Sequence, residues 1–354
     1  MLELGASLNR VAADAPEWPV LTTASESAPW RTLARQLRPL LRVNGLVKLP
    51  PELWFTACLA CTAAILAGVY RLPFSLPTLA VAEFIGVHYL IPLAGVAVCG
   101  ACVVAGGGRA AAHTFCVALP CYAVVLVIHF NVKLWAPHIN PVLYDSVYWQ
   151  IDRHLYWLVD LCMTLRTAIS GIVPLGGMFY LQGFILLFYV AFCYHAFRTP
   201  GKLRQLTMSV LLLQGLGGLA YLALPALGPF LYEQGLNAAV GDVQRDMLDF
   251  YRHSVALGSD WLVLHGSDGF VKGLAAMPSL HAGATWLFFI FAWKHAPRLV
   301  PFYLPLLAYI FIAAVSTRWH YLVDLPAGML LAWLSLWLAE RLVPDTSEAR
   351  ILAD

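Results

Sequence analysis

"AAMPSLHAGATW", residues 275–286, places a Pro-Ser pair and a histidine directly before the apolar run LFFIFAW. Proline costs nothing in the first turn of a helix, because the first N–H groups of a helix have no partner within it. The stretch therefore predicts that Pro278 and Ser279 lie in the first turn of a helix. An imidazole is not needed to begin a helix, so His281 requires another explanation.

The composition of the whole chain indicates a membrane protein. Of 354 residues, 60% are hydrophobic and 12% are charged, and the mean hydropathy is +0.71. Soluble domains carry about 25% charged residues. The formal net charge is only +2 and the basic residues are scattered, so nucleic acid is not an expected partner. The eight cysteines lie almost entirely in apolar runs and predict no disulfide framework.

Apolar segments along the chain are about as long as the roughly 20 residues that a helix needs to cross a bilayer. We expect about eight spans, at 53–70, 80–106, 112–134, 175–197, 205–226, 281–298, 301–317 and 320–342. Two long stretches interrupt them. Residues 135–174 are aromatic and amphipathic, which suits a helix at the membrane interface, and residues 227–280 are acidic and mixed. The predicted fold is an all-α integral membrane protein.

Basic residues in the short connections predict the orientation. Residues 198–204 contain three Lys or Arg residues and residues 294–298 contain two, while Arg109 and a basic stretch at 31–48 add more. Short basic connections mark the cytoplasmic side of a membrane protein. We therefore expect a multi-pass plasma (inner) membrane protein with both termini in the cytoplasm and both long stretches facing the periplasm or exterior.

Under this topology, the segments that begin near residues 281 and 320 both start at the outer face. The N-terminus of a helix offers unpaired N–H groups and partial positive charge to an anion, and Ser279 could add a hydroxyl. His320 and Asp324 are four residues apart, so both would lie on one face of a helix within hydrogen-bond reach. Asp324 would orient the imidazole of His320 and leave its Nε2 atom free. Arg318 is a nearby cation for an oxyanion.

This set of groups predicts chemistry on a phosphate ester at a lipid headgroup. We expect His320 to attack phosphorus and form a phosphohistidine, and Asp324 to stabilise the resulting imidazolium. His281 would protonate the departing oxygen and later act as a base. Water or an alcohol would then accept the phosphoryl group. The expected partners are a lipid phosphate donor and a lipid or alcohol acceptor, and the reaction requires no metal and no other cofactor.

These residues resemble the type 2 phosphatidic acid phosphatase superfamily, whose members carry a Pro-Ser-x-His motif and, two spans later, a His-x-x-x-Asp motif in a six-helix core. The first corresponds to Pro278, Ser279 and His281, and the second to His320 and Asp324. The stretches MPSLHAG, RWHYLVDLPAG, LPALGPFLY and YDSVYWQID are more similar to the branch that includes inositol phosphorylceramide synthase. The resemblance implies a metal-independent lipid phosphatase or phosphotransferase, in that branch one of sphingolipid metabolism.

The resemblance also implies a domain organisation. It covers about 112–342, which would form the phosphatase or phosphotransferase core of six helices. Residues 51–111 would add two transmembrane helices before this core. Residues 1–50 and 343–354 would be cytoplasmic tails.

The sequence departs from the family pattern in its cations. Many members have a Lys and an Arg-Pro pair in a first motif, and a Ser-Arg pair before the nucleophilic histidine, where this chain has Ala313 and Ala314. Another cation must then bind phosphate, and the candidates are Arg318, Lys272, Arg245 and Arg252. With Ser279, we take Arg318 and Lys272 as the phosphate-binding set. The chain thus has fewer phosphate-binding cations than many members of the family, and it has Leu280 in place of a glycine. Both features resemble the transferase branch and favour transfer or diester cleavage over monoester hydrolysis.

Several polar residues have two interpretations. Asp145 and Asp152 are candidate substrate contacts, although an interfacial helix with a solvated acidic face explains them equally well. The histidines away from the motifs are expected to pack or to lie at the interface: His88, His113, His129 and His195.

Two other functions remain open at this level. A proton-coupled transporter could relay protons through its intramembrane His and Asp residues. A zinc-dependent membrane hydrolase could use His281, His320 and Asp324 as metal ligands.

Overall fold

The computed structural model describes residues 49–79, 109–172, 177–233, 238–272 and 274–344, together with residues 95, 98, 100–102 and 105. The chain divides into two units, residues 1–49 and 50–354, and the second contains every described helix. The regular structure of the described residues is entirely helical, which confirms the all-α prediction. Most residues of the predicted tails and of the predicted span at 80–106 lie outside the described residues.

Seven long helices correspond to the predicted spans that the structure describes. Among the described residues, four segments are long and apolar enough to cross a membrane: Pro51–Tyr70, Ala111–Ile139, Phe179–Arg198 and Pro297–Ser316. The chain is thus a multi-pass helical protein by length and composition, and the count of eight spans stays a prediction. The helices are α2 (Pro51–Tyr70), α5 (Arg109–Ile139), α8 (Gly177–Arg198), α9 (Pro200–Ala220), α12 (Leu280–His295), α13 (Val300–Ser316) and α14 (Asp324–Leu342).

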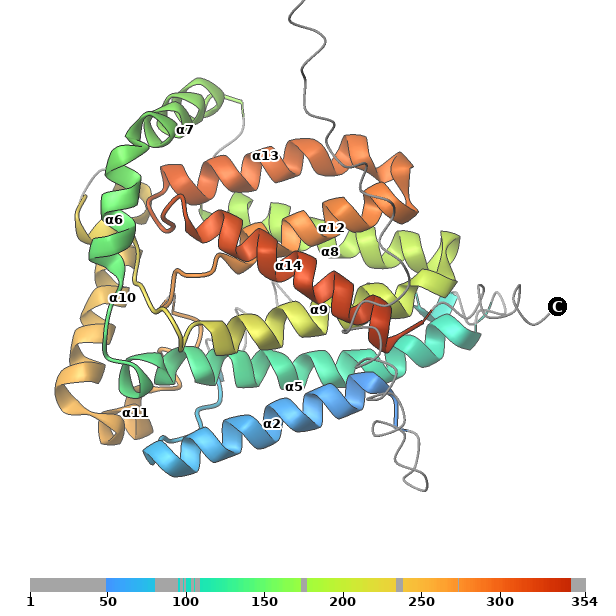
Figure 1. The fold of residues 1–354 in the computed structure, drawn as a ribbon, viewed down its shortest axis with the longest axis horizontal. Coiled ribbons are helices and arrows are strands. Elements are labelled where there is room, and N and C mark those ends of the chain that lie inside the picture. Colours follow the sequence, from blue (N-terminus) through green and yellow to red (C-terminus); the bar gives the residue numbers. More distant parts are fainter. Residues whose placement is uncertain are drawn as a thin grey trace, which may run out of the picture. The chain divides into compact units, whose positions relative to one another are not determined.

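The two long stretches between the spans also fold into helices. Residues 135–174 contain α6 (Asp145–His154) and α7 (Tyr156–Ile169), in agreement with the predicted amphipathic helix. Residues 227–280 contain α10 (Ala238–Leu257) and α11 (Ser259–His265), which the sequence pattern did not predict. Figure 1 shows these four helices together on the left, across one end of the long helices. The start of α12, which carries His281, and the loop that carries His320 lie at this same end.

Helix α9 lies at the centre of the bundle. It packs against α5, α12 and α14, and most of its side chains between Leu203 and Gly218 are buried. Leucines and small residues fill this helix, so its neighbours can approach closely on several sides. Because α5 and α12 both pack against α9, this packing sets the rotation of each helix about its own axis.

Two glycines bring α12 and α14 into backbone contact. A Cβ atom on Gly283 would lie 2.8 Å from the carbonyl oxygen of Gly328, and a Cβ atom on Gly328 would overlap the carbonyl oxygen of Ser279. At the same crossing, the backbone N–H of Ser279 donates to the carbonyl oxygen of Asp324 at 3.0 Å. The beginnings of the two helices are therefore held side by side, and the two sequence motifs come together.

Replacing Gly328 with alanine should push α12 and α14 apart. Overpacking of this kind costs about 1–3 kcal/mol, so we expect a lower midpoint of thermal unfolding in detergent and a loss of activity. Gly68→Ala is the matched control, because nothing lies within 4 Å of a Cβ atom there. Equal stability and activity in the two variants would contradict the role of this crossing.

Candidate active site

His320 and Asp324 are in contact, as the sequence predicts, but not across one helical face. Helix α14 begins at Asp324, so His320 lies on the turn before it. The Nδ1 atom of His320 is 3.2 Å from Oδ2 of Asp324 and 3.0 Å from the carbonyl oxygen of Ala276. The same Oδ2 atom accepts from the backbone N–H of Tyr321 at 2.9 Å. The carboxylate thus fixes both the imidazole and the turn that carries it.

These contacts determine which nitrogen of His320 is free. A backbone carbonyl oxygen can only accept a hydrogen bond, so Nδ1 of His320 carries a hydrogen. The Nε2 lone pair of the neutral ring is then available to a ligand. A carboxylate behind the ring would stabilise positive charge on it if Nε2 formed a bond.

His281 lies in the first turn of α12. The N-cap of this helix is Ser279, whose Oγ atom accepts from the backbone N–H of Ala282 at 3.4 Å. The expectation that Pro278 and Ser279 fill the first helical turn was wrong by one or two residues, because Leu280 is the first helical residue. The ring of His281 packs against two aromatic rings of α8, with ring centroids 5.0 Å from Tyr180 and 4.5 Å from Phe184.

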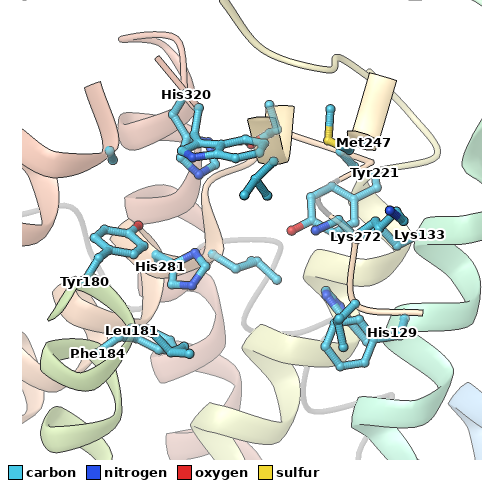
Figure 2. A pocket seen from close by; sticks show the side chains of 18 of the residues that line it. His129, Lys133, Tyr180, Leu181, Phe184, Tyr221, Met247, Lys272, His281 and His320 are labelled. Atoms are coloured by element: carbon cyan, nitrogen blue, oxygen red, sulfur yellow. The ribbon is translucent and has the colours of Figure 1, made fainter. Parts of the chain in front are cut away.

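The two histidines line one cavity of about 440 Å³. Helices α5, α8, α9, α10 and α12 and the loops before α12 and α14 contribute to its wall. Figure 2 shows Tyr180, His281 and His320 on one side of the cavity, and His129, Lys133, Tyr221 and Lys272 on the other. The structure therefore brings the two motifs together in the wall of one cavity.

Among the predicted phosphate-binding residues, Lys272 is the one that lines the cavity. Its ammonium group pairs with Asp246 of α10. Ser279 is fully buried beneath the helix start and caps α12. Arg245 and Arg252 lie on the exposed surface of α10, where they pair with Asp242 and Asp249. These two arginines do not reach the cavity.

Arg318 does not lie in the cavity wall. Its side chain is 1% exposed and its guanidinium pairs with Glu233 and with Asp152, the latter at 3.2 Å between Nη2 and Oδ2. It also lies over the ring of Trp149, with Cζ 5.8 Å from the ring centroid. Its φ angle of 59° is in the left-handed region, which costs a non-glycine residue about 1–2 kcal/mol. The ion pairs hold this strained residue two positions before His320.

Asp145 and Asp152 also lie outside the cavity wall. Asp145 accepts from the backbone N–H groups of Leu227 and Gly228, and from the hydroxyl of Tyr321 at 2.8 Å. Asp152 accepts from the backbone N–H of Leu322 at 2.9 Å and pairs with Arg318. The structure places both carboxylates against the turn that carries His320.

The face of α6 that carries these acids is buried, which corrects the interpretation of a solvated acidic face. Asp145 is 3% exposed and Asp152 is fully buried, whereas the apolar Val147 is 50% exposed. Burial raises the pKa of both carboxyl groups, and their hydrogen bonds from backbone N–H groups oppose this rise. Asp145 and Asp152 therefore face the protein interior, whereas the exposed side of α6 is mixed, with Val147 and Ile151 beside Arg153 and His154.

Lys133 is a cavity residue that the sequence pattern did not indicate. Lys133 and His129 both lie on α5 and line the cavity, and His129 also packs against the rings of Phe130 and Tyr221, in agreement with the packing role expected for it. The Nζ atom of Lys133 is 5.4 Å from the ring centroid of Tyr221, and no carboxylate of the described residues pairs with it. A lysine within an apolar segment is energetically costly and usually marks a functional site. The position of Lys133 in such a segment was therefore the sequence feature that could have indicated its role.

The described residues contain no group of three or more His, Cys, Asp or Glu side chains that could hold a metal ion. A comparison with family models matches residues 149–338 to the family described as the PAP2 superfamily. The match extends from α6 into α14 and includes both sequence motifs. Comparisons with curated proteins and with solved structures found no match.

Proposed function

The chain belongs to the PAP2 superfamily, and from this premise we propose that it is a lipid phosphotransferase or lipid phosphatase that works through a phosphohistidine on His320. The observation that supports this most directly is the orientation of His320, whose Nδ1 atom is held by Asp324 and by the carbonyl oxygen of Ala276. This arrangement leaves Nε2 for attack on phosphorus, with His281 in the wall of the same cavity.

The proposed reaction has two steps. The lone pair of His320 Nε2 forms a bond to phosphorus, and the bond to the leaving oxygen breaks while His281 supplies a proton to that oxygen. His281 then takes a proton from the incoming water or alcohol, whose oxygen forms the new bond to phosphorus. The P–N bond breaks, and its electron pair returns to His320. Asp324 stabilises the imidazolium character of His320 in both steps.

We propose that Lys133 and Lys272 supply positive charge for the phosphate oxygens. Figure 2 shows both lysines across the cavity from His320. Lys133 lies on α5, before the residues matched by the family model, so its assignment rests on its place in the cavity wall. Lys133 would then be the main phosphate-binding cation, in place of Arg318.

We propose that three buried residues position His320: Arg318, Asp145 and Asp152. Ser279 is proposed to position His281. Their contacts fix the turn before α14 and the start of α12. This assignment replaces direct substrate contact for the two aspartates. It explains why Arg318 and the two aspartates lie outside the cavity wall and yet contact the turn that carries His320.

The remaining expectations form part of the same proposal. The six helices of 112–342 would make the core, with two additional spans at 51–111 and cytoplasmic tails at 1–50 and 343–354. The basic connections support a plasma membrane location with the cavity open to the periplasm or exterior. The similarity to the inositol phosphorylceramide synthase branch supports transfer between lipids, including sphingolipids, over simple hydrolysis.

The test is to incubate the purified protein in nanodiscs with labelled phospholipids and polyprenyl phosphates, with and without ceramide or diacylglycerol. Mass spectrometry then identifies the products, and separation under alkaline conditions preserves a phosphohistidine for mapping. We expect phosphoryl release or transfer in excess chelator, with label on His320. Activity that chelator abolishes would favour a zinc hydrolase. Substrate flux across sealed vesicles without a covalent product would favour a transporter.

Replacing Lys133 with methionine should weaken the binding of the phosphate group, because it removes the charge and keeps most of the unbranched side chain. Loss of one preorganised charge of this kind lowers kcat/KM by about 10²-fold. Lys294→Met is the control, because Lys294 is exposed and pairs with Glu340 at 3.1 Å. Wild-type kinetics in Lys133→Met would remove Lys133 from the phosphate site.

A further inference from the structure

A third imidazole lines the cavity and has no role in the proposed reaction. His129 is 5% exposed, and its Nδ1 atom is 3.2 Å from the backbone carbonyl oxygen of Gln214 in α9. The carbonyl can only accept, so Nδ1 carries the hydrogen. No described residue forms a hydrogen bond with the Nε2 atom of His129. The ring is therefore a buried hydrogen-bond acceptor in the wall of the cavity.

The surrounding residues hold this ring in a fixed orientation. Phe130 and Tyr221 meet it edge to face, each with ring centroids 5.5 Å away. Gly218 leaves the space for it, because a Cβ atom there would lie 3.1 Å from Nδ1 of His129. A side chain that is packed this closely has little freedom to turn Nε2 elsewhere. His129 is thus held in one orientation in the cavity wall.

The order of residues along α5 indicates what His129 binds. Tyr122, Leu126, His129 and Lys133 follow at helical spacing along the cavity wall. The stripe passes from an aromatic and an aliphatic side chain, through a hydrogen-bond acceptor, to a cation. The step of four positions from His129 to Lys133 corresponds to roughly 6 Å along the helix. An amphiphile with an apolar chain, a hydroxyl and a phosphate in that order matches this stripe.

The charge of Lys133 also restricts what His129 can do. A positive charge one helical turn away disfavours a second positive charge on the imidazole. His129 is therefore suited to accept a hydrogen bond and poorly suited to take a proton in the reaction. A hydroxyl group of a lipid can donate such a hydrogen bond without bringing charge.

We propose that His129 determines specificity by accepting a hydrogen bond, at Nε2, from a free hydroxyl of the lipid substrate that lies close to the phosphate but does not react. This inference rests on the proposed function, since it takes Lys133 as the phosphate-binding cation. The hydroxyl can belong to the lipid backbone or to the headgroup. Both sources present the same chemistry to His129.

Two matched substrate pairs test the proposal. Lysophosphatidic acid and its 2-deoxy analogue differ in a backbone hydroxyl, and phosphatidylglycerol and phosphatidylpropanol differ in headgroup hydroxyls. We expect the wild-type protein to prefer the hydroxylated member of at least one pair by about tenfold or more in kcat/KM. His129→Phe should lose this preference while keeping its rate on the partner that lacks the hydroxyl. His129→Gln should retain part of it, because an amide oxygen can accept.

The outcomes separate this proposal from the function on which it rests. No hydroxyl preference in the wild-type protein, or an equal loss on both members of each pair in His129→Phe, would overturn the role of His129. Full turnover in His320→Ala would instead overturn the proposed function. Binding of the four lipids to His320→Ala, compared with His320→Ala/His129→Phe, still measures the hydroxyl preference if no lipid is turned over.

Discussion

Alanine in place of His320 is expected to lower phosphoryl transfer from any lipid donor by at least about 10⁴-fold. Removing the nucleophile of a covalent mechanism costs about this much or more, because the remaining groups bind the substrate but cannot form the intermediate. The label on residue 320 should disappear in the same variant. Initial rates with a labelled donor and mass mapping of the trapped protein measure the two effects.

His253→Ala is the matched control for this variant. His253 lies on the exposed surface of α10 and stacks on Trp261, away from the cavity. It should leave the rate and the label unchanged. Asp324→Asn should retain the fold and reduce the rate strongly, because an amide cannot stabilise the imidazolium as a carboxylate does. Full activity in His320→Ala with an intact fold would exclude the phosphohistidine mechanism.

Methionine in place of Arg318 is expected to destabilise the protein by about 3–5 kcal/mol, the usual cost of leaving buried carboxylates without their cation. Asp152 would keep its hydrogen bond from Leu322, but its second oxygen would lose its partner. Glu233 would lose its ion pair with Arg318. The measurement is the midpoint of thermal unfolding in detergent, together with the rate at a temperature where the variant is folded.

A double variant separates positioning from direct phosphate binding. In Arg318→Met/Asp152→Asn, one uncompensated charge is removed together with the arginine, so part of the stability should return. Arg245→Met is the control, because this arginine forms an exposed pair on α10 and such pairs contribute about 0–1 kcal/mol. Wild-type stability in Arg318→Met, combined with a pure rise in KM for the phosphate donor, would contradict the positioning role.

The sequence predicted the helices that the structure describes because the signal for them is local. An apolar segment of sufficient length and the turn chemistry around Pro278 are readable without knowledge of neighbours. The two helices of 227–280 were missed because their composition is mixed and no long apolar run marks them. The contact between His320 and Asp324 was predicted for an incomplete reason, since a tight turn and not a helix brings them together.

The roles of the charged residues could not be predicted in the same way. Asp152 and Arg318 are 166 positions apart, and no local pattern indicates that they pair. Sequence reasoning therefore assigned Arg318 to the phosphate and Asp152 to the substrate. The structure places them together behind the nucleophile.

By itself, the sequence determined the all-helical membrane character and the two motifs, because hydrophobicity and residue identity are local properties. Only the tertiary structure decided which polar side chains line the cavity. That outcome depends on the rotation of each helix about its axis, which is set by contacts such as that of Gly283 with Gly328. In the same way, the packing of α5 against α9 places His129 and Lys133 in the cavity wall.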